Sequence, residues 1–237
     1  MDKFAGFSLD QFRFMAELQA NNNKGWFDSQ RERWEALRES LRTLCIELTP
    51  FISNLDPELE TEPKTGRCLG RINRDIRFSK DKSPYKEYVD ILFFPREQRR
   101  TCAPGFAVGV GAKYSYIGTW LGAGMAEFRE RFEANIAAHD KLFNSYLEAN
   151  DNFSEMSIDG DSFAKPRIEG LEGPAYGWAQ RKFFYMGLLT PPEKVAKMGR
   201  GYIDLAEKTF IRLYPLFLFA TSRTLPADLE RFRNKFA

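Results

Sequence analysis

The chain has few of the residues that build most metal centres and many nucleophilic sites. Its 237 residues include one histidine, His139, so metal sites made from several histidines and paired histidine acid–base catalysis are excluded. A Ser-His-Asp or Cys-His site would have to use His139, which we expect on a helix as a solvated side chain. The three cysteines, Cys45, Cys68 and Cys102, are too widely spaced for a CxxC knuckle. The sequence therefore predicts no metal site, and its thiols should be reduced.

Long apolar runs are also missing. None approaches the roughly 20 residues that a membrane-spanning helix needs. The segment Met1 to Phe4 lacks the charged-then-apolar layout of a signal peptide. Two nucleotide-binding motifs are absent as well, since no Gly-Lys-Ser/Thr occurs and Tyr114 replaces the third glycine of a dinucleotide fingerprint. We expect a cytoplasmic protein without a membrane partner.

The composition is that of a folded globular protein, with 43% hydrophobic and 29% charged residues. A chain of this length can bury one large core, and nothing in its composition separates two halves. A single domain, 1–237, is the prediction.

Helical signals are concentrated at the two ends of the chain. Ser8 and Gln11 form a capping-box pattern ahead of apolar residues at helical spacing, and the run 21–25 should end this first helix. A second, longer helix is expected from Asp28 or Ser29 to Ile52. Helical spacing predicts further helices over 125–136, 142–147 and 202–219.

The middle of the chain has short runs with β character. Strands are predicted over 68–72, 89–94, 105–110 and 114–121, and one more near 181–186. The connection 111–113 has hairpin length, which favours antiparallel pairing. The fold class predicted is α+β, with N-terminal helices, a central mainly antiparallel sheet and C-terminal helices.

The segment from Lys64 to Lys86 concentrates positive charge. It holds eight cations and two acids, which gives +6, whereas the whole chain carries only +2. The other residues therefore sum to −4, and the field of this segment should attract anions to one place.

This charge predicts a pocket for a small molecule that carries phosphate or carboxylate groups. Arginine presents a planar fork to two oxygens, lysine a point charge, and a hydroxyl or amide can complete the set of contacts. Whether catalysis follows, and with which cofactor, the residues do not say. The candidate ligand-binding residues are Arg71, Arg74, Arg77, Lys82, Lys86, Tyr85 and Asn22.

Two other interpretations stay open. The same cations could contact the phosphates of a nucleic acid, with Trp26, Phe78 or Tyr85 stacking on bases, although a pI near 8.3 is modest for that task. Alternatively, the segment is a structural or interaction element whose arginines pair internally with Asp75 and Asp81, or with acids elsewhere such as Glu58, Glu60 and Glu62.

The stretch from Arg74 to Lys86, RDIRFSKDKSPYK, closely resembles the signature of the uncharacterised family named domain of unknown function 2461. The stretch from Asn21 to Phe27, NNNKGWF, resembles the other N-terminal mark of that family. The resemblance also includes the hairpin that ends at 122–124 and, more weakly, 165–167 and 182–184. The resemblance spans most of the chain and implies no reaction, cofactor or substrate.

Overall fold

The first helix forms where the capping box predicts it. In the computed structural model, which describes residues 3–77, 79–165 and 167–236, α1 spans Leu9–Ala20. The Gln11 amide nitrogen donates to Ser8 Oγ at 3.4 Å, and the Ser8 amide nitrogen donates to Gln11 Oε1 at 3.0 Å. These two bonds satisfy donors that the helix itself leaves unpaired.

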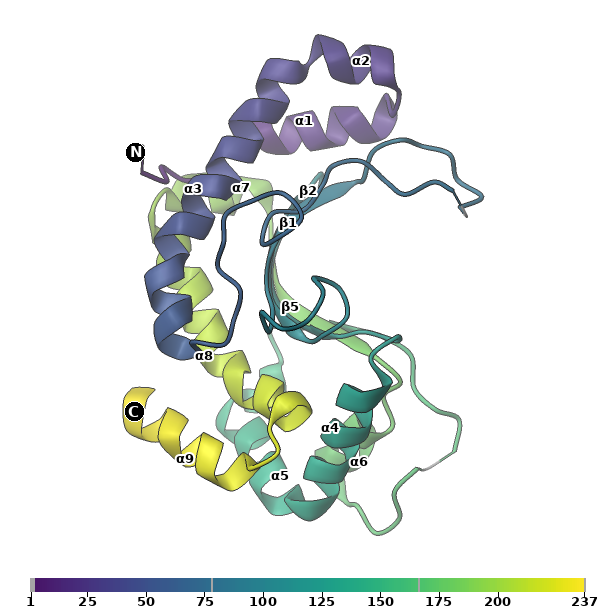
Figure 1. Cartoon of the computed structure of the whole chain (residues 1–237), viewed down its shortest axis with the longest axis vertical. Coiled ribbons are helices and arrows are strands. Elements are labelled where there is room, and N and C mark those ends of the chain that lie inside the picture. Colours follow the sequence, from purple (N-terminus) through teal and green to yellow (C-terminus); the bar gives the residue numbers. More distant parts are fainter. Residues whose placement is uncertain (1–2, 78, 166, 237) are drawn as a thin grey trace. The chain divides into compact units, whose positions relative to one another are not determined.

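The next helical region is divided in two, which corrects its predicted start. A short helix, α2 (Lys24–Ser29), begins directly after Asn23, whose Oδ1 accepts from the Trp26 amide nitrogen at 3.0 Å. The long helix α3 (Arg31–Leu55) follows after Gln30. Its apolar stripe is buried, as predicted. Figure 1 shows α1, α2 and α3 in purple and blue, with α1 alongside α3.

Five antiparallel strands form the sheet, in the order β1-β2-β3-β5-β4. Their bounds are β1 (Tyr88–Phe93), β2 (Gly105–Gly111), β3 (Ser115–Leu121), β4 (Ser157–Asp159) and β5 (Phe184–Thr190). The predicted strand 68–72 is wrong, because that segment is a loop that touches the sheet through one isolated bridge, Leu69 to Ile91. The short β4 was not predicted, and it pairs with β5 with Ile158 opposite Met186.

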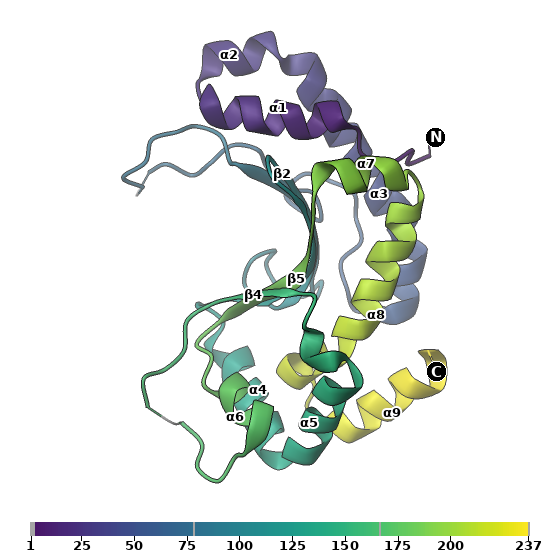
Figure 2. The ribbon, with the colours of Figure 1, turned by 180° about the vertical axis from the view of Figure 1, so that it is seen from behind.

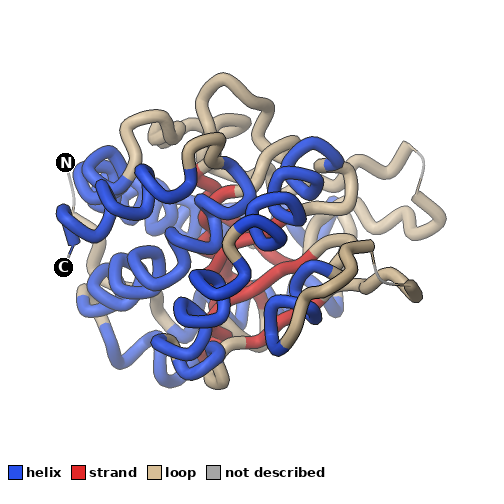
Figure 3. Tube along the Cα trace, turned by 90° about the horizontal axis from the view of Figure 1, so that it is seen from below, coloured by secondary structure: helices blue, strands red, loops and turns tan. Residues whose placement is uncertain are grey.

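The remaining helices follow the strands. They are α4 (Ala126–Ala138), α5 (Asp140–Ala149), α6 (Gly173–Ala179), α7 (Pro192–Met198), α8 (Gly201–Thr221) and α9 (Leu225–Phe236), with a 3₁₀ turn, η1, at Asp151–Phe153. The periodicity predicts α4, α5 and α8, but not the others. Figure 3 separates these helices, in blue, from the strands, in red. Over the described ranges no helix is both long and apolar enough to cross a bilayer.

Contacts divide the chain into two compact units, which we describe separately. Unit 1 holds the described residues up to Phe93, together with 107–117 and 189–207. Unit 2 holds 94–106, 118–188 and the described residues from Lys208 onward. Because β2, β3, β5 and α8 each contribute residues to both units, neither unit is a continuous stretch of sequence.

Each unit has its own aromatic core. In unit 1 the rings of Phe4 and Phe7 pack edge-to-face at 5.1 Å, and Phe7 meets Tyr202 at 5.3 Å. In unit 2 Phe132 and Phe143 meet Trp178, which in turn packs at 5.2 Å against Phe184. Figure 2 shows α4, α5 and α6 of unit 2 grouped together. Buried aromatic area of this kind supplies much of the stabilisation of a core.

Candidate functional site

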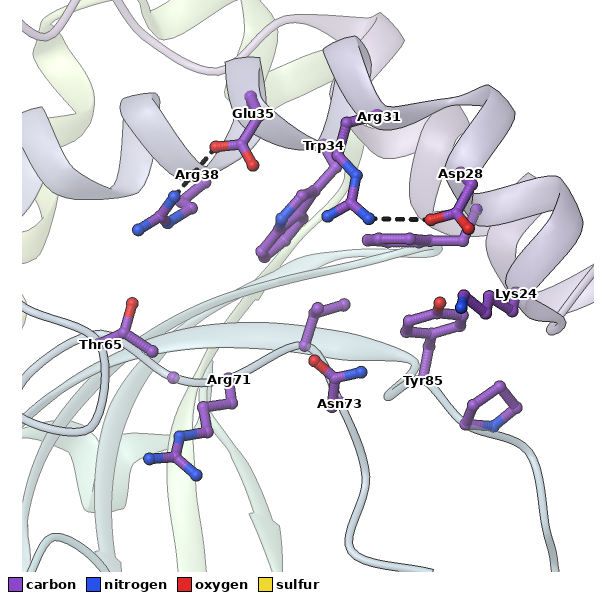
Figure 4. A pocket seen from close by; sticks show the side chains of 14 residues that line it. Lys24, Asp28, Arg31, Trp34, Glu35, Arg38, Thr65, Arg71, Asn73 and Tyr85 are labelled. Carbon is purple, nitrogen blue, oxygen red and sulfur yellow. Dashed lines mark hydrogen bonds and ion pairs between the residues drawn. The ribbon is translucent and has the colours of Figure 1, made fainter.

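Unit 1 contains a pocket of about 580 Å³ between a helical wall and a loop wall (Figure 4). This volume lies in the range of small-molecule sites. The helical wall, from α2 and α3, consists of Lys24, Phe27, Asp28, Arg31, Trp34, Glu35 and Arg38. The loop wall consists of Thr65, Gly70, Arg71, Ile72, Asn73, Pro84 and Tyr85.

The helical wall is one face of consecutive turns. Arg31, Trp34, Glu35 and Arg38 stand at positions i, i+3, i+4 and i+7 of α3, so their side chains project on the same side. Trp34 is only 7% exposed, and it anchors this face while the charged side chains beside it reach solvent. The wall therefore combines an apolar centre with charged groups around it.

Backbone hydrogen bonds fix the loop wall. The Gly70 amide nitrogen donates to the Asp90 carbonyl at 2.8 Å, which ties the loop to β1. Asn73 and Tyr85 form an antiparallel bridge, and the Arg74 amide nitrogen donates to the Pro84 carbonyl at 2.8 Å. These bonds hold Arg71, Asn73 and Tyr85 on one surface, although Tyr85 lies twelve residues after Asn73 in the sequence.

Asn22 and Tyr85 join the two walls. Asn22 Nδ2 donates to the Tyr85 carbonyl and Asn22 Oδ1 accepts from the Tyr85 amide nitrogen, both at 3.0 Å. The Tyr85 ring also stacks on Phe27, with centroids 4.1 Å apart and planes 18° apart. The two walls thus have a fixed separation at this end of the pocket.

Positive charge exceeds negative charge in the pocket. Four cations and two carboxylates line it, which leaves a net charge of +2. Arg31 pairs with Asp28 at 2.8 Å, and Arg38 pairs with Glu35 at 3.0 Å. Lys24 and Arg71 have no carboxylate partner among the described residues, and both are exposed. Their charges are therefore available to an anion that enters the pocket.

Tyr85 is 5% exposed, and its environment keeps the phenol protonated. Burial raises the pKa of Tyr85, and the negative charge of Asp28 raises it further, against a smaller opposing effect of Arg31. A neutral phenol can donate a hydrogen bond to an oxygen of a ligand.

The seven candidate residues do not all meet in one place. Arg71 and Tyr85 line the pocket, and Asn22 holds the Tyr85 backbone from behind. The other four lie outside the lining, among them Arg74, which pairs with Asp81, and Arg77, which pairs with Asp75 at 2.6 Å. Lys82 Nζ donates to the Ile76 carbonyl at 2.9 Å, and the Lys86 backbone nitrogen donates to the Ile72 carbonyl at 2.8 Å.

Nearby carboxylates neutralise half of the cations in the segment from Lys64 to Lys86. Besides the pairs of Arg74 and Arg77, Lys64 lies 3.8 Å from Glu62, and Arg67 lies 3.2 Å from Glu60. The internal Arg–Asp pairs considered from the sequence are therefore present. Four of the eight cations in 64–86 have a carboxylate partner, which lowers the charge that this surface offers to a polyanion.

Two of the aromatic residues considered for base stacking already have one ring face stacked on a neighbouring phenylalanine. Trp26 stacks on Phe14 at 5.9 Å, and Tyr85 is covered by Phe27. Phe78 lies outside the described residues.

Sequence reasoning missed the helical wall. Arg31 and Arg38 lie on the polar face of the predicted second helix, and Lys24 lies in the run 21–25 that was predicted to end the first helix; their contribution to a pocket was not anticipated. A signal was available: two arginines seven residues apart with a tryptophan between them, on one helical face, combine charge with a large apolar ring.

Comparison with known proteins identifies a family and no activity. A family model described as conserved hypothetical protein (DUF2461) matches residues 10–219 of the chain. No curated protein matches it. The match includes both walls of the pocket.

Proposed function

Because the chain belongs to the DUF2461 family of conserved hypothetical proteins, whose description names no reaction, we propose a function from the pocket itself. The protein binds a small molecule that carries phosphate or carboxylate groups in the pocket of unit 1. The observation that supports this most directly is the excess of cations in the lining, with Lys24 and Arg71 unpaired by acids.

The arrangement of the charges also suggests the form of the ligand. Lys24 and Arg71 stand at separate places around the pocket, and the rings of Trp34 and Tyr85 and the amide of Asn73 lie between them (Figure 4). A ligand with an apolar or planar body and acidic groups at its ends would satisfy both features. Aromatic side chains would contact the body, and the cations would contact the acidic groups.

The proposal is one of binding. A carboxyl group that acts as a general acid or base must be free to exchange its proton with substrate. Asp28 and Glu35, the carboxylates that line the pocket, lie in ion pairs with arginines.

We place this function in the cytoplasm. Phosphorylated metabolites are abundant there, and an odd number of widely spaced cysteines, as in this sequence, does not fit the disulfide framework of a secreted protein.

Thermal shift and isothermal titration with pyrophosphate, AMP and citrate at low salt test the proposal. At least one of these anions should raise the melting temperature, because a ligand that binds only the folded state stabilises it. Arg71→Ala and Lys24→Ala should each weaken its binding about tenfold, since a charge-assisted hydrogen bond contributes roughly 1.5–3 kcal/mol.

Arg77→Ala is the matched control, because Arg77 is an exposed arginine of the same loop that pairs with Asp75 outside the pocket. Its binding constant should stay within about twofold of the wild type. Absence of any stabilising anion, or equal losses for Arg71→Ala and Arg77→Ala, would refute a pocket at this position.

A gel shift with a single-stranded oligonucleotide at two salt concentrations distinguishes nucleic-acid binding from binding of a small anion in the pocket. A surface that binds nucleic acid through phosphate contacts gains affinity steeply as the salt concentration falls. Arg77→Ala would then weaken the affinity for the oligonucleotide as much as Arg71→Ala does. The pocket proposal expects no such parallel loss, because only Arg71 of the two faces the cavity.

A further inference from the structure

Unit 2 holds a second concentration of cations, separate from the pocket. Three positive groups surround the ring of Phe163: the guanidinium carbon of Arg167 lies 4.6 Å from its centroid, that of Arg129 5.6 Å, and Lys182 Nζ 5.7 Å. Arg167 and Lys182 belong to the two short motifs that the pocket leaves unused. We call Arg129, Glu133, Phe163, Arg167, Gln180 and Lys182 the Phe163 cluster.

Backbone pairing holds this cluster together. The Phe163 amide nitrogen donates to the Gln180 carbonyl at 2.8 Å, and the Lys182 amide nitrogen donates to the Asp161 carbonyl at 2.8 Å. Ser162 and Arg181 form the antiparallel bridge between them. The segment 161–163 is therefore fixed against 180–182, at the end of α6. The ring of Phe163 contacts Arg129 on α4.

One carboxylate, that of Glu133, lies within ion-pair distance of two of the three cations. Glu133, which stands one turn after Arg129 on α4 and is 8% exposed, lies 3.1 Å from Arg167 Nε and 3.6 Å from Arg129 Nε. Lys182 has no acid partner in the part of the chain that the structure describes. Three cations and one carboxylate leave the cluster with a net charge of +2.

Three buried side-chain atoms of the cluster have no hydrogen-bond partner among the described residues: two donors, on Gln180 and Arg129, and one acceptor, Glu133 Oε1. Gln180 is 7% exposed, and its Nε2 makes no hydrogen bond with any described residue. The Nε of Arg129 is also buried without one, and its distance to Glu133 is too long for a hydrogen bond. Buried donors are almost always satisfied in folded proteins, so a pair of them beside excess positive charge needs an explanation.

Anchoring of the loop explains only part of this arrangement. Cation–π contacts and the Arg167–Glu133 ion pair would fasten 161–163 and Arg167 to α4 without further groups. That role gives no reason for the amide of Gln180 to be buried without an acceptor. It also gives no reason for Lys182 to be placed over a ring that two arginines already contact.

We propose that the Phe163 cluster binds an oxyanion, a phosphate or carboxylate group, independently of the pocket in unit 1. Arg129, Gln180 and Lys182 donate to the anion. Glu133 holds Arg167 and Arg129 in position and offsets part of their mutual repulsion. The acceptor oxygens of the anion would satisfy the buried donors, and its charge would balance the two cations in excess.

Titration of the full-length protein with inorganic phosphate and with citrate at low salt tests this. The side-chain amide resonances of Gln180, assigned from their loss in Gln180→Glu, should move in a saturable way with at least one of the two. Gln180→Glu keeps the shape of the side chain but replaces the donor with a carboxyl group, so isothermal titration should show binding weakened tenfold or more. Lys182→Ala, at an exposed position, should weaken it severalfold.

Lys165→Ala is the control, because Lys165 is an exposed lysine of the same loop that lies outside the cluster. It should leave the movement of the Gln180 resonances unchanged. Arg71→Ala should leave that movement unchanged as well, even though it weakens binding in the pocket of unit 1, and this difference separates the two sites. The proposal is overturned if the Gln180 resonances stay fixed with both anions, or if Lys165→Ala weakens binding as much as Lys182→Ala. Loss of the response in Arg71→Ala would likewise refute an independent site.

Discussion

At the scale of single residues, Asn22 has a structural task beside the pocket. Its amide group makes two hydrogen bonds to the backbone of Tyr85, which is 63 positions away in the sequence. Asn22→Ala should therefore lower the free energy of unfolding by about 1–3 kcal/mol, because it leaves a partly buried backbone donor and acceptor unsatisfied. Urea denaturation followed by circular dichroism measures this change.

Asn21→Ala is the matched control. The Asn21 side chain is exposed and donates at 2.9 Å to the Glu17 carbonyl of its own helix. Its removal should cost less than about 0.5 kcal/mol, as is usual for surface substitutions. Equal losses for the two variants would show that Asn22 does not join the walls of the pocket.

Residue types alone indicated the right region for the pocket but not its members. Arg71 and Tyr85 were predicted and line the pocket. Arg74 and Arg77 were also predicted, because they belong to the segment with the highest density of cations, but each pairs with an acid a few residues away. Charge density along a sequence measures how many cations are present, and it does not show which of them an adjacent acid neutralises. Convergence depends on long-range contacts such as Asn22 with Tyr85, which no local pattern reports.

At the scale of elements, helices with strong local signals were predictable and short ones were not. The capping box of Ser8 and Gln11 and the long apolar stripe of α3 carry enough local information to determine their helices. By contrast, α2, α6 and α7 have six or seven residues, and β4 has three. Such elements depend on tertiary packing, because isolated short helices are unstable in water. The same dependence explains why α2 was not predicted as a helix of its own.

The loop between Asn73 and Tyr85 is an element held by ionised carboxylates. Asp81 accepts from the Ser83 hydroxyl at 2.6 Å and from the Ser83 amide at 2.9 Å, and it pairs with Arg74. These interactions, Ser83 first, lower the pKa of Asp81 to about 2. The hydrogen bonds and charge of Arg77 lower the pKa of Asp75 to about 2.

This loop should therefore lose its local order only in strong acid. A carboxyl whose folded pKa lies below its ordinary value of 3.8 stabilises the folded loop above that value, and the contribution disappears as pH falls towards about 2. Carbon-detected NMR should give titration midpoints near 2 for Asp75 and Asp81, and the Ser83 amide should shift with Asp81.

Asp81→Asn supplies the control for the titration. The Ser83 amide should then show no transition in that range, while Asp75, which pairs separately with Arg77, keeps its own. Midpoints near 3.8 in the wild type would mean that the ion pairs do not persist in solution.

At the scale of the whole molecule, the division into two units bears on the predicted single domain. That prediction remains to be tested. Three strands, β2, β3 and β5, and one helix, α8, supply residues to both units, so the chain changes unit in the middle of regular elements. Domain boundaries usually fall in flexible linkers, whereas these lie within hydrogen-bonded structure.

We therefore expect the two units to unfold in one transition. Two tryptophans report on unit 1, Trp26 and Trp34, and two on unit 2, Trp120 and Trp178. Leu48→Ala removes a fully buried side chain of α3 in unit 1 and should cost about 2–5 kcal/mol. In a fluorotryptophan-labelled protein, ¹⁹F NMR during a urea titration should show that all four native signals disappear at the same urea concentration. Leu48→Ala should lower this midpoint equally for all four.

Leu9→Ala, at a position 36% exposed, is the control and should change the urea midpoint little. If Leu48→Ala shifts Trp26 and Trp34 while Trp120 and Trp178 keep their wild-type midpoint, the chain consists of two domains, and each binding site would then belong to a separate folding unit.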